Sequence, residues 1–212
     1  MQNQFIDIHT HKHYTDGTTY IFSCAIGKDR PPTDGTLFSA GIHPWAAGHV
    51  DLLASIGYLR TAPIVAVGEI GLDYAIDTTH DLQKEVFEAQ LSIAGQRKLP
   101  VIIHCVRAHN DVLSTLKEYD LKTVIFHGYI GSPEQTETII ERGCYLSFDE
   151  RSLASPKTVE SLRSAPLDRI FAETDDSEVP VSVIYKRIAE LRGMTEEELQ
   201  GIICENFKRI FQ

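Results

Sequence analysis

Short runs rich in Val, Ile and Phe alternate along the chain with longer stretches in which apolar residues recur at helical spacing. Eight of the short runs have the length and composition of β-strands: Phe5–His9, Thr19–Ile26, Leu37–Ile42, Ile64–Glu69, Val101–His104, Val124–His127, Cys144–Phe148 and Ile170–Thr174. The helical patterns fall near Val50–Leu59, Leu82–Lys98, Asn110–Tyr119, Glu134–Arg142, Pro156–Ser164, Val179–Arg192 and Glu196–Phe211. No internal repeat, low-complexity tract or linker interrupts this alternation, so we expect one domain over residues 1–212.

Residues typical of helix ends lie where several of these patterns begin or stop. Ser132 followed by Pro133 predicts an N-cap with proline in the first turn. Thr195 with Glu198 fits a capping box, and Gly143 is typical of the residue that ends a helix. These signals support the helical stretches that they bound.

Strands that alternate with helices favour a parallel sheet, and eight of them predict a (β/α)8 TIM barrel of the α/β class. Such barrels usually have about 250 residues, with about 200 as the lower limit, so a chain of 212 residues forms a compact one. We expect the barrel to be trimmed between strands 2 and 3, where Lys28–Thr36 contains Pro31 and Pro32 and predicts a loop. An open doubly wound sheet is the alternative architecture.

The composition is that of an ordinary globular chain, with 42% hydrophobic and 24% charged residues. No apolar run approaches the roughly 20 residues that span a bilayer, so we expect no membrane association. The N-terminal sequence lacks the basic start and apolar segment of a secretory signal, and the expected location is cytoplasmic. The four cysteines form no CxxC pair, which indicates reduced thiols rather than a disulfide framework.

The formal net charge of −10 bears on the possible partners. Nucleic-acid-binding proteins usually present a basic surface, so this charge argues against tight, non-specific binding of duplex DNA. Some acidic residues are candidate metal ligands, however, and a bound ion would cancel their charge. Because a small site needs only local positive charge, a phosphate-containing substrate remains compatible with the composition.

Asp7, His9 and His11 form an Asp-x-His-x-His pattern directly after an apolar start. Side chains alternate along a strand, so all three project from one face, which on the first strand of a barrel can be the interior. Two imidazoles two residues apart at a strand end can hold one metal ion. The alternative is a polar edge strand with incidental histidines.

Four other chemistry-bearing residues follow apolar runs at equivalent places, namely Glu69, His104, His127 and Asp175. Each alone is ordinary, since a histidine after a strand is often a loop residue and an acid there often caps a helix. Together with the two N-terminal histidines they fall at the C-terminal ends of five predicted strands, the face that carries TIM-barrel active sites. Histidine and carboxylate ligands suit zinc and manganese, whereas magnesium prefers more oxygen. Six such groups exceed what one tetrahedral zinc needs, and a pair of ions sharing a carboxylate fits better.

Seven short motifs extend over nearly the whole chain, namely DIHTH, GIHP, VGEIGLDY, PVIIHC, FHGYIGS, AETD and ENFKRIF. In these motifs and in their order, the sequence resembles the TatD family of metal-dependent deoxyribonucleases, within the amidohydrolase superfamily. The resemblance implies two divalent ions, with zinc, manganese or magnesium as candidates. It implies that His9 and His11 bind the first ion, that Glu69 bridges both, and that His104 and His127 bind the second.

The resemblance also implies that Asp175 touches the first ion and orients or deprotonates the attacking water. His43, in GIHP, would face the substrate pocket, and Asp7 would support the metal-bound histidines. Two divalent ions with two carboxylates leave a site charge of about +2, which suits a phosphodiester and an attacking hydroxide. The ions lower the pKa of bound water and stabilise charge on the phosphoryl oxygens, and no covalent protein intermediate is required.

The chain departs from the family around the expected mouth of the site. Val106 stands where many relatives carry an arginine, and Arg107 follows it, so Arg107 or Lys12 is the candidate phosphate contact. Tyr129 is a further candidate substrate contact. Trp45 and Tyr74 are candidate platforms for a nucleobase.

These features predict a metal-dependent phosphodiesterase, a deoxyribonuclease acting on single strands or ends of DNA by metal-activated water. The DNA part rests on the resemblance alone. A metal-dependent hydrolase of a small amide, lactone or phosphoester is the alternative. A catalytically silent metal-binding or partner-binding protein is a third reading.

Overall fold

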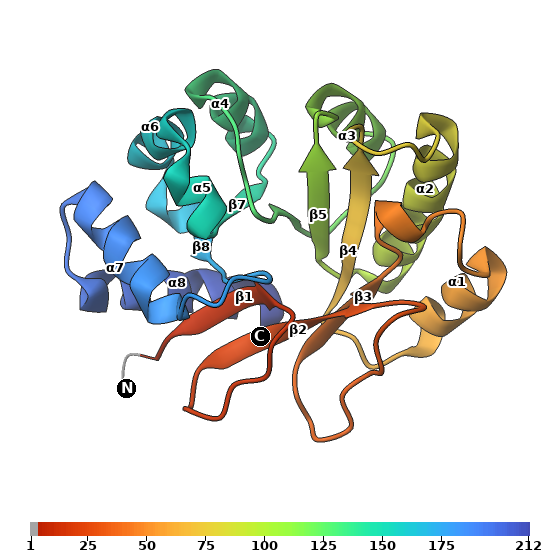
Figure 1. Cartoon of the computed structure of the whole chain (residues 1–212), viewed down its shortest axis with the longest axis horizontal. Coiled ribbons are helices and arrows are strands. Elements are labelled where there is room, and N and C mark those ends of the chain that lie inside the picture. Colours follow the sequence, from red (N-terminus) through yellow and green to blue (C-terminus); the bar gives the residue numbers. More distant parts are fainter. Residues whose placement is uncertain (1–3) are drawn as a thin grey trace. The chain divides into compact units, whose positions relative to one another are not determined.

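The computed structural model describes residues 4–212 (Figure 1). Its strands are β1 (Ile6–Thr10), β2 (Thr19–Ala25), β3 (Phe38–Gly41), β4 (Ala66–Asp73), β5 (Val101–Val106), β6 (Val124–Phe126), β7 (Tyr145–Phe148) and β8 (Ile170–Ala172). Its helices are α1 (Leu52–Thr61), α2 (His80–Arg97), α3 (His109–Leu116), α4 (Pro133–Glu141), α5 (Glu150–Ala154), α6 (Pro156–Ser164), α7 (Val181–Arg192) and α8 (Glu196–Phe211), with 3-10 turns η1 (Pro44–Ala46) and η2 (Leu167–Arg169). Over this part of the chain, no helix is long and apolar enough to cross a membrane.

The strands follow one another in the sheet in their order along the chain, from β1 to β8, and the pairs β1–β2, β3–β4, β4–β5 and β7–β8 are parallel. The first and last strands are also neighbours, because the N–H of Asp175, just beyond β8, donates to the carbonyl of His9 in β1 at 3.0 Å. This arrangement is the (β/α)8 TIM barrel that the sequence predicts, and an open sheet with separated edge strands is excluded. Between β2 and β3 the described chain contains no helix, which confirms the predicted trimming.

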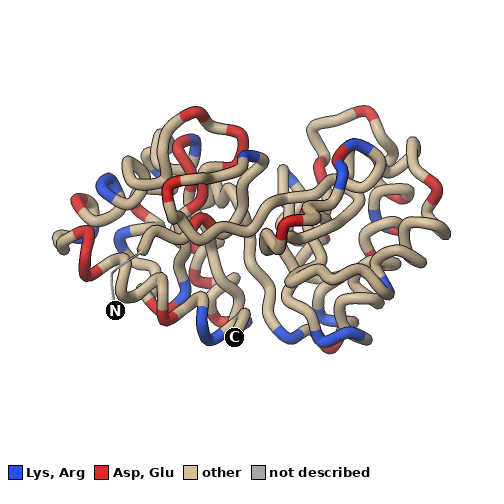
Figure 2. The backbone as a smooth tube through the Cα atoms, turned by 90° about the horizontal axis from the view of Figure 1, so that it is seen from below, with Lys and Arg blue, Asp and Glu red and all other residues tan. Residues whose placement is uncertain are grey.

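The backbone divides into two compact units. The first unit comprises residues 1–22 and 126–212 and holds β1, β7, β8 and the helices from α4 to α8. The second unit comprises residues 23–125 and holds β3, β4, β5 and the helices from α1 to α3. Acidic and basic residues are interspersed along the backbone of both (Figure 2). The single domain expected over residues 1–212 stays a prediction.

Two buried polar side chains fasten helices to strands in the first unit. Tyr185 of α7 is fully buried, and its hydroxyl donates to the carbonyl of Ile6 at 3.0 Å and accepts from the N–H of the same residue at 3.1 Å. Asn206 of α8 donates to the carbonyls of Leu167 and Ile170, at 2.9 and 3.0 Å. A buried side chain that satisfies backbone groups in this way fixes the position of its helix, so α7 and α8 hold the starts of β1 and β8.

Two glutamines of α2 have the same role in the second unit. Gln90 accepts from the N–H of Ile42 at 2.6 Å and donates to its carbonyl at 3.2 Å, which holds the end of β3. Gln83 accepts from the N–H of Asp73 at 2.7 Å and donates to its carbonyl at 2.8 Å, which holds the end of β4. Both contacts lie at the strand ends that lead into GIHP and out of VGEIGLDY, so they position the residues of those motifs.

The predicted helix signals are confirmed, and one helix was missed. Ser132 caps α4 in a capping box, Thr195 caps α8 in another, and Gly143 follows α4 with φ +76°. The missed helix, α5, has only five residues, and Asp149 caps it by accepting from the N–H of Ser152. A helix this short carries too little periodic pattern to be recognised from hydrophobic spacing.

The prediction that Glu69 and His104 end their strands is wrong. Strand β4 continues to Asp73 and β5 to Val106, and the two strands stay paired, with Gly71 opposite His104. Gly71 has φ +147°, and a Cβ there would lie 2.0 Å from the carbonyl oxygen of His104. Glycine therefore allows β4 and β5 to approach closely beyond Glu69, which lengthens both strands.

Candidate metal centre

The first unit brings together His9, His11 and Asp175, which we call the first cluster. His9 is fully buried in β1, and His11 follows that strand. Asp175 has φ +52°, and its own N–H and carbonyl bond to the backbone of His9 and His11, at 3.0 and 3.1 Å. Three residues from opposite ends of the chain are therefore tied by backbone bonds, which leaves little freedom in the position of the Asp175 carboxylate.

The spacing of the first cluster fits a divalent ion. The Oδ1 atom of Asp175 lies 3.7 Å from Nε2 of His9 and 3.5 Å from Nε2 of His11. These distances are longer than good hydrogen bonds. Ligand atoms around a tetrahedral zinc, each about 2.1 Å from the metal, lie about 3.4 Å apart. Two imidazole nitrogens and one carboxylate oxygen at this separation match both the donor chemistry and the size of such an ion.

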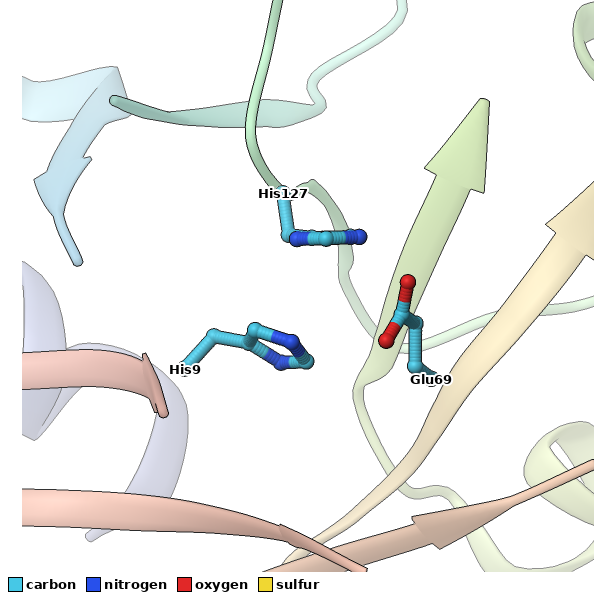
Figure 3. A group of neighbouring side chains, drawn as sticks. All are labelled: His9, Glu69 and His127. Carbon is cyan, nitrogen blue, oxygen red and sulfur yellow. The ribbon is translucent and has the colours of Figure 1, made fainter. Parts of the chain in front are cut away.

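His127, directly after β6, stands next to this cluster. Its ring centroid lies 4.3 Å from that of His9, with the ring planes 34° apart (Figure 3). Its Nδ1 lies 3.2 Å from Oε1 of Glu173, a fully buried carboxylate that also accepts from the N–H of Gly128 at 2.7 Å. A carboxylate on one ring nitrogen fixes the tautomer and leaves the other nitrogen, Nε2, as a ligand atom.

Asp7 lies behind the first cluster and is fully buried. Its Oδ2 accepts from the hydroxyls of Tyr14 and Thr174, both at 2.7 Å, and its Oδ1 accepts from the N–H of Thr174 at 3.1 Å. Burial raises the pKa of Asp7 to about 7, against the opposing effect of these hydrogen bonds. Burial and the neighbouring Asp7 raise the pKa of Tyr14 as well. The predicted supporting role of Asp7 stays a prediction, and these contacts favour it.

Arg151 of α5 lies on the outer side of Asp175. Its Nη2 donates to Oδ2 of Asp175 and, at 2.7 Å, to Oδ1 of Asp176, while its Nε donates to Oδ2 of Asp149 at 3.3 Å. Burial disfavours the charged guanidinium, but the carboxylates of Asp175, Asp176 and Asp149 outweigh it and raise the pKa of Arg151 above its ordinary value. The first cluster therefore has a permanent positive charge at its rim.

The second unit brings together His43, Glu69 and His104, which we call the second cluster. Oε1 of Glu69 lies 2.7 Å from Nδ1 of His104 and 3.1 Å from Nε2 of His43. The two imidazole nitrogens lie 3.3 Å from each other. These are hydrogen-bond distances, so the side chains of this cluster touch directly.

Asp73, at the end of β4, supports the second cluster. Its Oδ2 lies 3.2 Å from Nε2 of His104 and accepts from the indole N–H of Trp45 at 2.7 Å. Burial opposes ionisation of Asp73, but hydrogen bonds from His104, Trp45 and the N–H of Ala75 hold its pKa well below the usual range. The Nδ1 atom of His104 thus faces the carboxylate of Glu69 and its Nε2 faces that of Asp73, and an ionised carboxylate only accepts hydrogen bonds. The ring of His104 is therefore either a protonated imidazolium or a neutral ring whose Nδ1 binds a cation.

The tautomer of His43 follows from its place in the turn η1. Its Nδ1 accepts from the backbone N–H of Trp45 at 3.2 Å, so Nδ1 carries no proton and Nε2 carries one. That Nε2–H points at Glu69. A protonated nitrogen donates hydrogen bonds and does not ligate a metal, which favours the substrate-facing role predicted for His43 over a ligand role.

The predicted substrate contacts differ in their exposure and in their hydrogen-bond partners. Tyr129 is 2% exposed, and its hydroxyl lies 3.0 Å from Oγ1 of Thr136, so these contacts favour packing over contact with a substrate. Arg107 is exposed after β5, with φ +55°. The ammonium group of Lys12 donates to the carbonyl of Ser177 at 2.5 Å and pairs with Glu178 at 2.9 Å. Trp45 is 61% exposed with its indole N–H anchored on Asp73.

Sequence reasoning missed three residues of the site: Asp73, Glu173 and Arg151. Asp73 lies four residues after Glu69 in the same strand, hence on the same face, and this spacing was an available signal. Glu173 lies in the AETD motif, in which the resemblance to the family favours Asp175 as the ligand. Arg151 offered no signal, because its place depends on the unrecognised helix α5.

Several known proteins are similar to the chain. A family model described as TatD related DNase matches residues 32–212. The chain is 37% identical over 169 residues to the uncharacterized metal-dependent hydrolase YabD of Bacillus subtilis, which covers 70% of this chain and 66% of that one. It is 29% identical over 203 residues to the 3′-5′ ssDNA/RNA exonuclease TatD of Citrobacter rodentium, which covers 82% of this chain and 76% of that one.

The fold is similar to a crystal structure of YjjV, a TatD homologue from Escherichia coli K12. The TM-score is 0.85 over 100% of this chain and 99% of that chain. Sequence identity in this alignment is 24%, so the likeness concerns the fold. The chain spans about two thirds or less of the length of several curated relatives that it matches.

Proposed function

Since the chain belongs to the TatD family of related DNases, we propose that it is a metal-dependent phosphodiesterase that cleaves DNA at single strands or strand ends. The observation that carries the proposal is the first cluster, where two imidazoles and a carboxylate stand 3.5 and 3.7 Å apart, as ligands of an ion do. The Citrobacter relative is named a 3′-5′ ssDNA/RNA exonuclease, which supports the substrate class.

We assign the metal ligands as the family resemblance implies. His9, His11 and Asp175 would hold one ion, His104 and His127 a second, and Glu69 would be shared. The contacts of Glu173 with His127 and of Asp73 with His104 support the two histidines of the second ion. When bound, the ions would lower the pKa of water and neutralise charge that develops on the phosphoryl oxygens. The donor set of nitrogen and oxygen suits zinc or manganese.

Asp175 is the residue that takes the proton of the attacking water. Its backbone is tied to His9 and His11, so its carboxylate keeps its orientation while the substrate binds. Its Oδ1 faces the two histidines and its Oδ2 faces Arg151. The guanidinium stabilises the ionised form, which is the form that accepts a proton.

His43 donates a hydrogen bond to the substrate in this proposal. Its Nε2 carries the proton, because the backbone N–H of Trp45 occupies Nδ1. A donor aimed at the place where negative charge develops on a phosphoryl oxygen stabilises the transition state more than the ground state. This function requires the Nε2–H to turn from Glu69 to the substrate.

Trp45 accounts for the proposed preference for single strands or ends. The residue is 61% exposed, while the 2.7 Å hydrogen bond from its indole N–H to Asp73 holds the ring in place. An exposed and immobilised aromatic ring stacks on an unpaired base at low entropic cost. Bases inside a duplex are already stacked on each other, so this platform selects unpaired nucleotides.

The test uses protein loaded with zinc, manganese or magnesium and a 5′-labelled single-stranded oligonucleotide. Duplex DNA, a p-nitrophenyl phosphodiester and small amides are assayed in parallel. We expect shortened labelled products from the wild type and from Asp120→Asn, an exposed control that carries the same chemical change. Asp175→Asn should give no products. If no metal supports cleavage of DNA by the wild type, the proposal is wrong.

A small amide, lactone or phosphoester is the second candidate substrate. The net charge of −10 favours it, because a long polyanion is repelled more strongly than a small ester. Turnover of only the small substrates in the same assay would establish this alternative.

A further inference from the structure

We propose that Arg151 binds the substrate's phosphate group at the first cluster. The inference deepens the proposed function and rests on it for the identity of the substrate. The ligand chemistry is that of a phosphate mono- or diester, whose oxygens accept charge-assisted hydrogen bonds from guanidinium N–H groups.

The two carboxylate oxygens of Asp175 have different neighbours. Its Oδ1 faces the imidazoles of His9 and His11, at 3.7 and 3.5 Å, and its Oδ2 accepts from Nη2 of Arg151. The two oxygens of one carboxylate can serve a metal ion and a guanidinium at the same time. Arg151 therefore keeps its place beside the cluster when Oδ1 acts as a ligand.

Two of the three guanidinium nitrogens of Arg151 are held by carboxylates, and the third is available to a ligand. Its Nε and Nη2 are held by the carboxylates of Asp149, Asp175 and Asp176, whereas Nη1 makes no hydrogen bond within the described residues. The side chain is 58% exposed. A guanidinium has five N–H donors, so the two on Nη1 remain available to a ligand. A held guanidinium with free donors loses little entropy when it binds an anion.

The two cations expected from the sequence are less suited to this role. Lys12 is already engaged by the carbonyl of Ser177 and the carboxylate of Glu178. Arg107 is exposed and makes no ion pair within the described residues, so no carboxylate holds its guanidinium in place. Arg151, by contrast, bonds directly to a residue of the first cluster.

The surrounding charge makes phosphate binding depend on metal. Three carboxylates, from Asp149, Asp175 and Asp176, surround one guanidinium, so the local charge is negative and repels a free anion. A divalent ion at His9, His11 and Asp175 would cancel that excess. Arg151 should thus contribute to phosphate affinity in the metal-loaded protein, and phosphate should not bind to the metal-free protein.

The experiment measures binding without turnover. Inorganic phosphate and thymidine monophosphate are titrated calorimetrically into manganese-loaded wild type, Arg151→Gln, Arg151→Lys and the control Arg60→Gln, an exposed arginine of α1. Bound manganese is measured by elemental analysis at saturating metal. We expect Arg151→Gln to raise the phosphate Kd at least about tenfold, Arg151→Lys to raise it less, and Arg60→Gln to leave it unchanged.

Two results would overturn the inference. One is an unchanged phosphate Kd in Arg151→Gln. The other is a loss of manganese in that variant, which would mean that Arg151 acts by orienting Asp175. A wild type that cleaves no DNA, but whose manganese-dependent phosphate affinity falls in Arg151→Gln, would contradict the proposed nuclease and leave the phosphate contact standing.

Discussion

The first and second clusters use the same residue types at different spacings. In the first cluster the carboxylate oxygen of Asp175 stands 3.5 Å from Nε2 of His11, whereas in the second Glu69 lies 2.7 Å from Nδ1 of His104. The first cluster is held open by backbone bonds between β1 and the residue after β8. The second is made of side chains that satisfy one another. Backbone hydrogen bonds thus keep the side chains of the first cluster far enough apart for an ion. In the second cluster, the side chains are in direct hydrogen-bond contact.

The two clusters also differ in what lies behind them. Arg151 places a cation against the first cluster, whereas Asp73 places an anion against the second. A cation behind a carboxylate keeps it ionised, and an anion behind an imidazole makes its other nitrogen a better ligand. The first arrangement suits proton acceptance by Asp175, and the second suits tight metal binding by His104.

The largest expected effect comes from His11→Ala in the first cluster. Loss of an imidazole from three closely spaced donors should remove one ion, lowering kcat on labelled single-stranded DNA by roughly 10³-fold or more. Elemental analysis should show one fewer ion per chain than in the wild type. His49→Ala, an exposed histidine in neither cluster, is the control. Full metal content in His11→Ala would show that His11 is no ligand.

Gly71→Ala tests the backbone that supports the second cluster. The new Cβ would lie 2.0 Å from the carbonyl oxygen of His104 at φ +147°, so we expect a loss of about 3 kcal/mol or more in the free energy of unfolding. Urea denaturation measures it. The matched control, Gly57→Ala, meets no atom within 4 Å in α1 and should gain about 0.5–1 kcal/mol. Equal stability of the two variants would contradict this account of Gly71.

Asp73→Asn sharpens the difference between the clusters. The amide keeps the shape but weakens the hydrogen bond with His104, so metal affinity of the second ion should fall about 10–100-fold. The first ion should stay. The chain has one tryptophan, Trp45, which bonds to Asp73, so a fluorescence titration with metal reports on this cluster. Unchanged affinity for both ions would remove Asp73 from the proposed support.

The smallest effect is expected from Trp45→Ala. Loss of one stacking platform should weaken binding of single-stranded DNA by about 1–3 kcal/mol, which raises KM by roughly 5- to 150-fold, with kcat and the turnover of a p-nitrophenyl phosphodiester unchanged. Trp45→Phe keeps a ring and should recover part of the affinity. An equal change for both substrates would mean that Trp45 acts through Asp73 and not on a base.

Much of the fold followed from local pattern, and the errors have two causes. The caps at Ser132 and Thr195 are properties of a few consecutive residues, and both are confirmed. The ends of β4 and β5 were wrong because strand length here depends on the pairing of Gly71 with His104, which are far apart along the chain. Helix α5 was missed because five residues carry too little periodicity.

From the residues alone, strand alternation and strand order predicted that His9, His11 and Asp175 lie at one end of a barrel, and the structure brings the three side chains together. Only the tertiary structure decided how those groups are spaced, protonated and supported. The tautomer of His43, the ionisation of Asp73 and the place of Arg151 depend on partners distant in sequence. The periodicity of a sequence predicts on which face of a strand or helix a side chain lies. It does not predict the distance from that side chain to residues that are remote in sequence and become neighbours only in the folded chain.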